Sequence, residues 1–207
     1  MTDLRFYAAC LASYNAGRLH GAWIDASTDV DEMQAAINKM LRASSYPNVE
    51  VACPDCDAPD PECPTCHGRG KVPSAEEYAI HDYEERWNLG EYPGLERIVK
   101  FMELVEKAED RGIDADDVQA ILDHFGTDYI DTAGDAIENN FHGTYDSLTE
   151  YAEQFAEEVY GDVINKLPNV IAGHIDYESI ARDMELGGDV FTIDKYQGGG
   201  VLVFSAC

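Results

Sequence analysis

The stretch LRFYAACLASYNAGRLHGAWIDASTDVDEMQAAINKML, residues 4–41, decides the fold. Apolar and aromatic residues predict strands over residues 4–11 and 19–26. The segment Asn-Ala-Gly at residues 15–17 is typical of a turn, so the two strands are expected to pair as a hairpin at the start of the chain.

A helix is predicted directly after this hairpin. Asp29 and Glu32 have the spacing of a capping box, with Asp in place of the usual Ser or Thr, and apolar residues recur at helical spacing over residues 30–41. Residues 46–73 then form an insert rich in Pro and Cys, after which residues 78–83 are expected to form a strand. The first part of the chain is therefore predicted to be a small α+β unit that the insert interrupts.

The rest of the chain is mainly helical and ends in strands. Helices are predicted at residues 95–105, 118–125, 146–160 and 176–186, and Asp114 is the expected N-cap of the second. Strands are predicted at residues 190–194 and 201–204, joined by a turn at the glycines 198–200. We expect an α+β fold of three small domains. These are an N-terminal α+β domain (1–92) containing the insert (46–73), a helical middle domain (93–134), and a C-terminal α+β domain with an acidic helix and a terminal β-hairpin (135–207).

The charge is strongly negative, with 41 Asp and Glu against 14 Lys and Arg and a net charge of −27. A hydrophobic content of 45% argues against disorder, so the charge is expected on a folded surface that repels nucleic acid and anionic membranes and attracts cations or basic proteins. No apolar run approaches the ~20 residues of a membrane span, and the first residues lack a signal-peptide pattern. We therefore expect a soluble cytoplasmic protein.

The negative charge is concentrated in the middle of the chain. Residues 76–150 carry 16 of the 27 excess negatives. On the predicted helix 146–160, Asp146, Glu150, Glu153 and Glu157 share one face, opposite Leu148, Ala152, Phe155 and Val159, and no lysine is interspersed to offset their repulsion. Such a row is compatible either with imitation of DNA phosphates or with a salt-adapted, solvated surface, and composition alone leaves both open.

The candidate phosphate-mimicking carboxylates extend from the end of the first predicted domain into the acidic helix. They are Glu84, Glu85, Glu103, Glu106, Asp110, Asp114, Asp116, Asp117, Asp123, Asp128, Asp131, Asp135, Glu138, Asp146, Glu150, Glu153, Glu157 and Glu158.

The insert contains two C-x-x-C knuckles, Cys53-Pro-Asp-Cys56 and Cys63-Pro-Thr-Cys66, which together supply the ligands of a tetrahedral four-cysteine zinc site. Residues 63–70 also resemble a DnaJ-type knuckle. The segment Cys63 to His67 matches the haem-attachment pattern, but haem would leave the first knuckle unexplained, and a redox dithiol is the weaker alternative for two pairs so close together. We predict structural Zn²⁺, because four thiolates leave no open coordination position for catalysis.

No enzymatic motif stands out. The sequence has no P-loop, no dinucleotide fingerprint after a strand and no nucleophile in a recognised setting. His81 and Asp82 with Glu84 and Glu85 offer divalent-metal ligands, but neighbouring strand residues point to opposite faces, which disfavours a shared site. The protein is therefore expected not to be an enzyme.

Three stretches, residues 14–23, 77–84 and 175–188, resemble the ArdA family of antirestriction proteins in order and spacing. The resemblance implies an elongated, three-domain homodimer that mimics DNA, inhibits type I restriction-modification enzymes by binding their methyltransferase core in place of DNA, has no catalytic residues and is carried on mobile genetic elements. It also implies that residues 148–161 correspond to the family's antirestriction motif, near the dimer contact. The alternative is a zinc-ribbon adaptor for a basic protein partner, in which the acidity only confers solubility.

Overall fold

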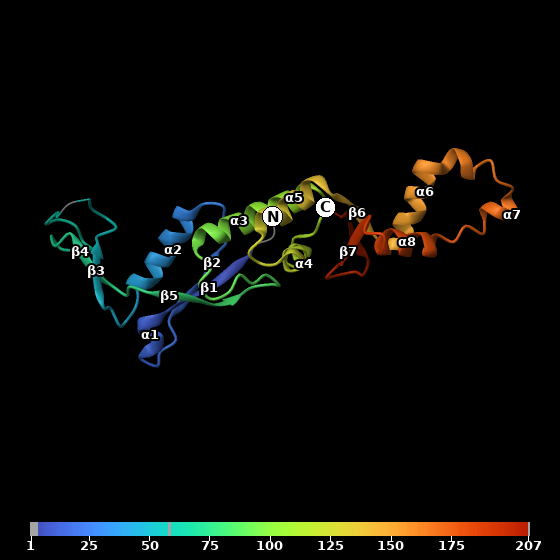
Figure 1. The fold of residues 1–207 in the computed structure, drawn as a ribbon. Coiled ribbons are helices and arrows are strands. Elements are labelled where there is room, and N and C mark those ends of the chain that lie inside the picture. Colours follow the sequence, from blue (N-terminus) through green and yellow to red (C-terminus); the bar gives the residue numbers. More distant parts are fainter. Residues whose placement is uncertain (1–3, 58, 207) are drawn as a thin grey trace. The chain divides into compact units, whose positions relative to one another are not determined.

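The computed structural model describes residues 4–57 and 59–206, and it confirms a mixed α+β fold (Figure 1). The chain divides between Glu103 and Leu104 into two compact units, here called unit 1 and unit 2. The division into three domains stays a prediction. Within the described residues, no helix is both long and apolar enough to cross a membrane.

Unit 1 is built on a three-stranded antiparallel sheet in the order β2-β1-β5. Its strands are β1 (Arg5–Cys10), β2 (Gly21–Asp25) and β5 (Tyr78–Tyr83), and its helices are α1 (Leu11–Asn15), α2 (Val30–Arg42) and the first part of α3 (Leu95–Asp110). The predicted pairing of the first two strands is confirmed. The sheet packs against α2, which buries Met33, Ile37, Met40 and Leu41.

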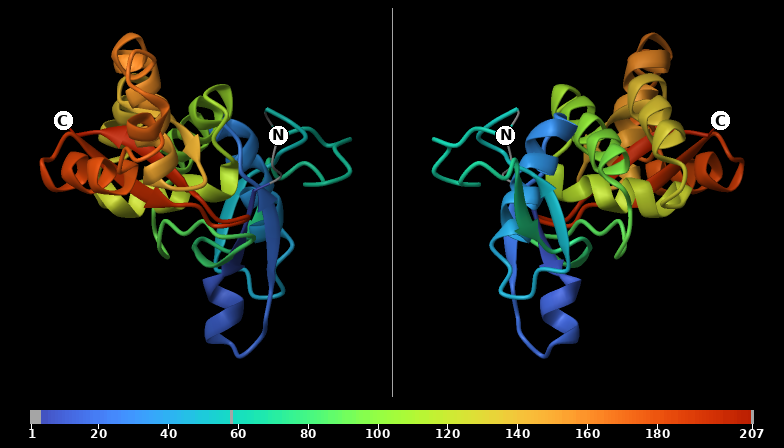
Figure 2. Two further views of the ribbon diagram at one scale, coloured as in Figure 1. Left: turned by 90° about the vertical axis from the view of Figure 1, so that its right-hand side faces the viewer. Right: turned by 90° about the vertical axis from the view of Figure 1, so that its left-hand side faces the viewer.

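The connection between β1 and β2 differs from the prediction. The strand ends at Cys10, and α1 continues the chain at the end of the hairpin where a longer strand and a simple turn were expected (Figure 2). The hydroxyl groups of Ser13 and Ser44 are 2.9 Å apart, and both residues are buried. This contact fixes α1 against the end of α2, and a periodicity pattern does not reveal it because serine is normally a surface residue.

The start of α2 has the capping contacts that the sequence predicted. The Asp29 carboxylate accepts hydrogen bonds from the backbone N–H groups of Asp31 and Glu32 at 2.9 and 3.2 Å, which satisfies two donors of the first turn. The Glu32 side chain accepts from the Ser27 hydroxyl at 3.3 Å, so the capping box is completed through Ser27. Two acidic residues in the first turn and Lys39 and Arg42 in the last turn also match the helix dipole.

The insert has a small sheet of its own. Strands β3 (Val49–Ala52) and β4 (Lys71–Ser74) pair antiparallel, with Val49 opposite Ser74 and Ala52 opposite Lys71. The sequence analysis predicted no strands in the insert. The two strands are only four residues long, and β4 contains Pro73, so neither carries a distinct periodic pattern.

Unit 2 combines helices with a second three-stranded antiparallel sheet, in the order β6-β8-β7. Its complete elements are α4 (Ala115–Phe125), α5 (Ile130–Asn139), β6 (Phe141–Tyr145), α6 (Leu148–Ile164), α7 (Asn169–Ala172), α8 (Tyr177–Leu186), β7 (Val190–Asp194) and β8 (Val201–Ser205). The terminal β7–β8 hairpin is confirmed, whereas α5, β6 and α7 were not predicted. The core of this unit includes the fully buried Ile137, Leu202 and Phe204.

Candidate metal centre and acidic surface

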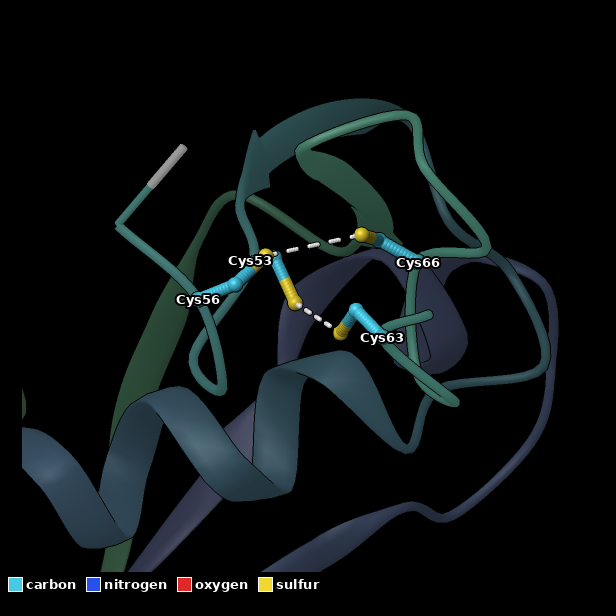
Figure 3. Close-up of side chains that lie close together, drawn as sticks. All are labelled: Cys53, Cys56, Cys63 and Cys66. Atoms are coloured by element: carbon cyan, nitrogen blue, oxygen red, sulfur yellow. Dashed lines mark hydrogen bonds between the residues drawn. The ribbon is translucent and has the colours of Figure 1, made fainter. Parts of the chain in front are cut away.

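Four cysteine side chains converge in the insert (Figure 3). The Sγ atoms of Cys53, Cys56, Cys63 and Cys66 all lie within 4.8 Å of one another. Cys53 Sγ is 3.8 Å from Cys63 Sγ, and Cys56 Sγ is 3.6 Å from Cys66 Sγ. Because a disulfide bond is only about 2.05 Å long, the four thiols are free. The structure thus brings together all four cysteines that the sequence predicted as ligands.

One backbone and one side-chain hydrogen bond stabilise the arrangement of the two knuckles. The Cys53 N–H donates to the Gly70 carbonyl at 3.0 Å, and the Thr65 hydroxyl of the second knuckle donates to the Asp55 carboxylate of the first. Gly70 has a φ of +67°, and a Cβ built there would lie 3.0 Å from Cγ of Pro59. A larger residue at this position would therefore be both strained and crowded.

The geometry fits a tetrahedral zinc ion. Four sulfurs at a Zn–S distance of about 2.3 Å are about 3.8 Å apart, close to the two distances given above. Burial raises the pKa of the Cys66 thiol, but hydrogen bonds from the Gly70 backbone and from the Cys56 and Cys63 thiols lower it to about 6. Since the thiolate is the metal-binding form, the donor set suits a cation that prefers sulfur, and the cluster could hold a metal ion.

Most of the predicted phosphate-mimicking carboxylates are on the surface. The exposed ones are Glu85, Glu103, Glu106, Asp110, Asp114, Asp123, Asp128, Asp131, Asp135, Glu138, Asp146, Glu153, Glu157 and Glu158, and the half-buried ones are Glu84, Asp116 and Glu150. Ion pairs of these carboxylates include Arg5–Glu84 at 2.5 Å, Lys107–Glu138 at 3.5 Å and Lys195–Asp114 at 3.2 Å. The Arg5 guanidinium also lowers the pKa of Glu84 by hydrogen bonding.

Asp117 is a correction to the predicted surface, because its side chain is only 1% exposed. One carboxylate oxygen accepts the Tyr196 backbone N–H at 2.6 Å, and the other lies 4.0 Å from Lys195 Nζ. Burial raises the pKa of Asp117, while the Tyr196 hydrogen bond and the Lys195 charge act in the opposite direction. Asp117 therefore joins α4 to the β7–β8 hairpin and presents no charge to a partner.

The acidic helix α6 also begins later than predicted. Ser147 is its N-cap, and its hydroxyl accepts the Glu150 N–H at 3.2 Å, while the Glu150 carboxylate accepts the Asp146 N–H at 2.6 Å. Asp146 therefore precedes the helix, and Glu150 has a capping role. Glu153 and Glu157 remain exposed one turn apart on α6.

The apolar side of α6 is only partly covered. Ala152 is buried, whereas Val159, predicted to point inward, is 54% exposed. Tyr160 and Val163 on α6 and Val170 and Ile171 on α7 are also more than half exposed. Sequence analysis missed this apolar patch, here defined as Val159, Tyr160, Val163, Val170 and Ile171. The large apolar residues on either side of the Pro168 loop were the available signal.

Comparison with protein-family models finds a match to the model described as "Antirestriction protein (ArdA)" over residues 6–197, which is most of the chain. No curated protein matches it.

Proposed function

Because the chain belongs to the ArdA family of antirestriction proteins, we propose that it is a DNA mimic that inhibits type I restriction-modification enzymes. In this proposal it occupies the DNA-binding surface of the methyltransferase core and catalyses no reaction. The observation that carries it is the accumulation of exposed carboxylates on α3, α4, α5 and α6, in a chain with a net charge of −27. At one phosphate charge per ~1.7 Å of duplex, this charge equals that of roughly 46 Å of DNA.

The charge arrangement supports mimicry over simple solubility. A solubilising surface normally intersperses both signs of charge. Within the described residues, Glu153, Glu157 and Glu158 on α6 have no Lys, Arg or His within ion-pairing distance. Like charges on neighbouring turns cost a few tenths of a kcal/mol each, and a partner rich in Lys and Arg would convert that cost into binding energy.

The test is competition with DNA. The purified protein is expected to displace a fluorescent duplex from a type I methyltransferase complex, because both ligands use the same basic surface. Its apparent affinity is expected to fall steeply as salt rises, because salt screens the attraction between exposed charges. Fluorescence anisotropy at several salt concentrations measures both effects. Full retention of the duplex at saturating protein would refute the proposal.

We also propose that the protein is a homodimer, with the apolar patch of α6 and α7 covered by a second copy. Val159 and Val163 are four residues apart and share one face of α6. Large exposed apolar side chains that share one helix face commonly mark interaction surfaces. The five patch residues are each more than half exposed in the single chain.

Replacing Val159 and Val163 with Asp is expected to weaken the dimer at least about tenfold, since burying two unpaired charges opposes association. Sedimentation equilibrium should then show a species near the 22.9 kDa chain mass where the unchanged protein gives twice that mass. Leu19→Asp is the control, because Leu19 is 88% exposed in unit 1. An unchanged dimer in the double variant would place the contact elsewhere.

For the insert we propose Zn²⁺ as the bound ion, in a structural role. Its four thiolates would add a further charge of about −2 to the surface after neutralisation by one Zn²⁺. A second candidate function, a zinc-ribbon adaptor for a basic partner, is favoured by one observation. The insert has its own sheet and its own buried cluster of Cys53, Cys63, Cys66 and Val72.

A further inference from the structure

Unit 1 contains a pocket of about 500 Å³ that lies apart from the cysteine cluster. It is lined by Tyr14 and Ile80–Tyr83, and by Asn88, Gly90 and Glu91 of the following loop. Two of the three stretches that resemble the ArdA family, residues 14–23 and 77–84, meet in this pocket. Tyr14 is 53% exposed, so its ring contributes little to the core.

A β-bulge shapes the pocket. In the β1–β5 pairing, Ala8 lies opposite Ile80 and Tyr7 opposite Asp82, so His81 is an extra residue in β5 with no opposite partner. A bulge of this kind breaks the strict alternation of side chains and redirects one of them. His81 and Asp82 therefore line the same pocket, although alternation predicted that they would point to opposite faces.

The loop that follows β5 is fixed over the pocket by hydrogen bonds. The Ile80 N–H donates to the Glu91 carbonyl at 3.0 Å, and the Tyr83 hydroxyl donates to the Gly90 carbonyl at 2.5 Å. These bonds bring the Glu91 carboxylate to 4.0 Å from Nε2 of His81. The lining thus includes Glu91 on the fixed loop and Asp82 on the strand.

Aromatic rings also line the pocket. The Tyr14 and His81 rings meet edge to face at 5.0 Å, and Tyr83 also lines the pocket. The lining residues include two carboxylates, Asp82 and Glu91, and neither lysine nor arginine. A planar cation satisfies both features at once, because it stacks on aromatic rings and donates in-plane hydrogen bonds to carboxylates.

We propose that this pocket binds the guanidinium group of an arginine side chain on the protein that the chain inhibits. Arginine fits better than lysine because its flat fork of donors suits carboxylates and aromatic faces together. A bound metal ion is disfavoured, since in the part of the chain that the structure describes only the four thiols form a metal-ligand group. The identity of the partner rests on the proposed function, whereas the preference for guanidinium rests on the pocket alone.

The test is an NMR titration of the full chain, without any restriction enzyme, with three probes: the Nα-acetyl amides of arginine, lysine and citrulline. The arginine probe is expected to shift the ring signals of Tyr14 and His81, the lysine probe to bind more weakly, and the uncharged citrulline probe to leave them unchanged. Equal shifts with citrulline would overturn the proposal. Because no enzyme is present, failure here and failure of the DNA competition are distinguishable.

Two variants check the location. Asp82→Asn combined with Glu91→Gln is expected to weaken arginine binding at least about tenfold, because two charge-assisted hydrogen bonds are lost. Glu50→Gln combined with Glu62→Gln removes the same charge from exposed positions of the insert and is expected to leave the affinity unchanged. If the first variant folds poorly, Tyr14→Leu at the exposed ring is expected to reduce the affinity severalfold. Unchanged binding in the folded variants would overturn the assignment.

Discussion

Replacing Glu153, Glu157 and Glu158 with lysine is expected to weaken inhibition of a type I enzyme on the order of 100-fold. Each reversal changes the interaction by about 1 kcal/mol near a solvated, salt-screened interface, so three reversals cost about 3 kcal/mol, and about 1.4 kcal/mol corresponds to a factor of ten. All three side chains are exposed on α6, so the fold should be retained. Glu150 is left unchanged because its carboxylate caps the helix through the Asp146 N–H.

The matched control places the same change of charge elsewhere. Glu50, Asp57 and Glu62 are exposed in the insert, and their replacement by lysine alters the net charge equally. Competition titrations with duplex DNA compare the two triple variants, and circular dichroism checks that both remain folded. A local contact on α6 predicts a large loss only in the first variant. Equal losses would show that total charge matters more than the α6 surface.

Removal of zinc is expected to abolish the ordered structure of the insert and to leave the rest of unit 1 folded. Structural zinc ions supply about 10–16 kcal/mol of apparent binding energy in small zinc modules, and the insert's buried cluster consists of three of the thiols and Val72. The sheet of β1, β2 and β5 packs instead on α2 through Met33 and Ile37, which are fully buried.

The experiment combines metal analysis with hydrogen exchange. Protein purified without added zinc should contain one equivalent, and Cys53→Ser with Cys56→Ser should contain none. Amide protection in β3 and β4 should then be lost, while protection in β1 and α2 persists. Cys10→Ser, outside the cluster, is the control. A metal-free natural protein with a protected insert would contradict the zinc assignment, and loss of inhibition in a variant with intact β1 would show that inhibition requires the folded insert.

Much of the architecture could be predicted wherever local pattern and tertiary packing agree. Helix α2 has a capping residue, dipole-matched charges and an apolar stripe, so its start at Val30 was expected. The four cysteines were identifiable because zinc ligation needs fixed residue types at fixed spacing. Helix α5 was missed, and it contains Gly134, which is buried near the Lys107 side chain. Its amphipathic pattern is short, and glycine ordinarily disfavours helix.

Other errors arose because single residues were judged by type and not by face. Asp117 precedes Ile121 by four residues, so it lies on the apolar face of α4, and this spacing could have indicated its burial.

Strand β6 contains Gly143 in an alternating polar sequence, and it becomes a strand by pairing with β8 more than fifty residues later. The pocket beside β5 depends on the bulge at His81, and a bulge depends on the pairing of two distant strands.

The antiparallel pairing of β3 and β4 also means that the insert could be replaced by another protein segment. Val49 and Ser74 are opposite each other, and the Asn48 N–H donates to the Ser74 carbonyl at 3.0 Å, so the chain leaves and rejoins unit 1 at neighbouring positions. The core of unit 1 is therefore insensitive to the length of what lies between them. A fluorescent domain grafted between these two residues would report on complex formation while the carboxylates of α6 keep their natural surroundings.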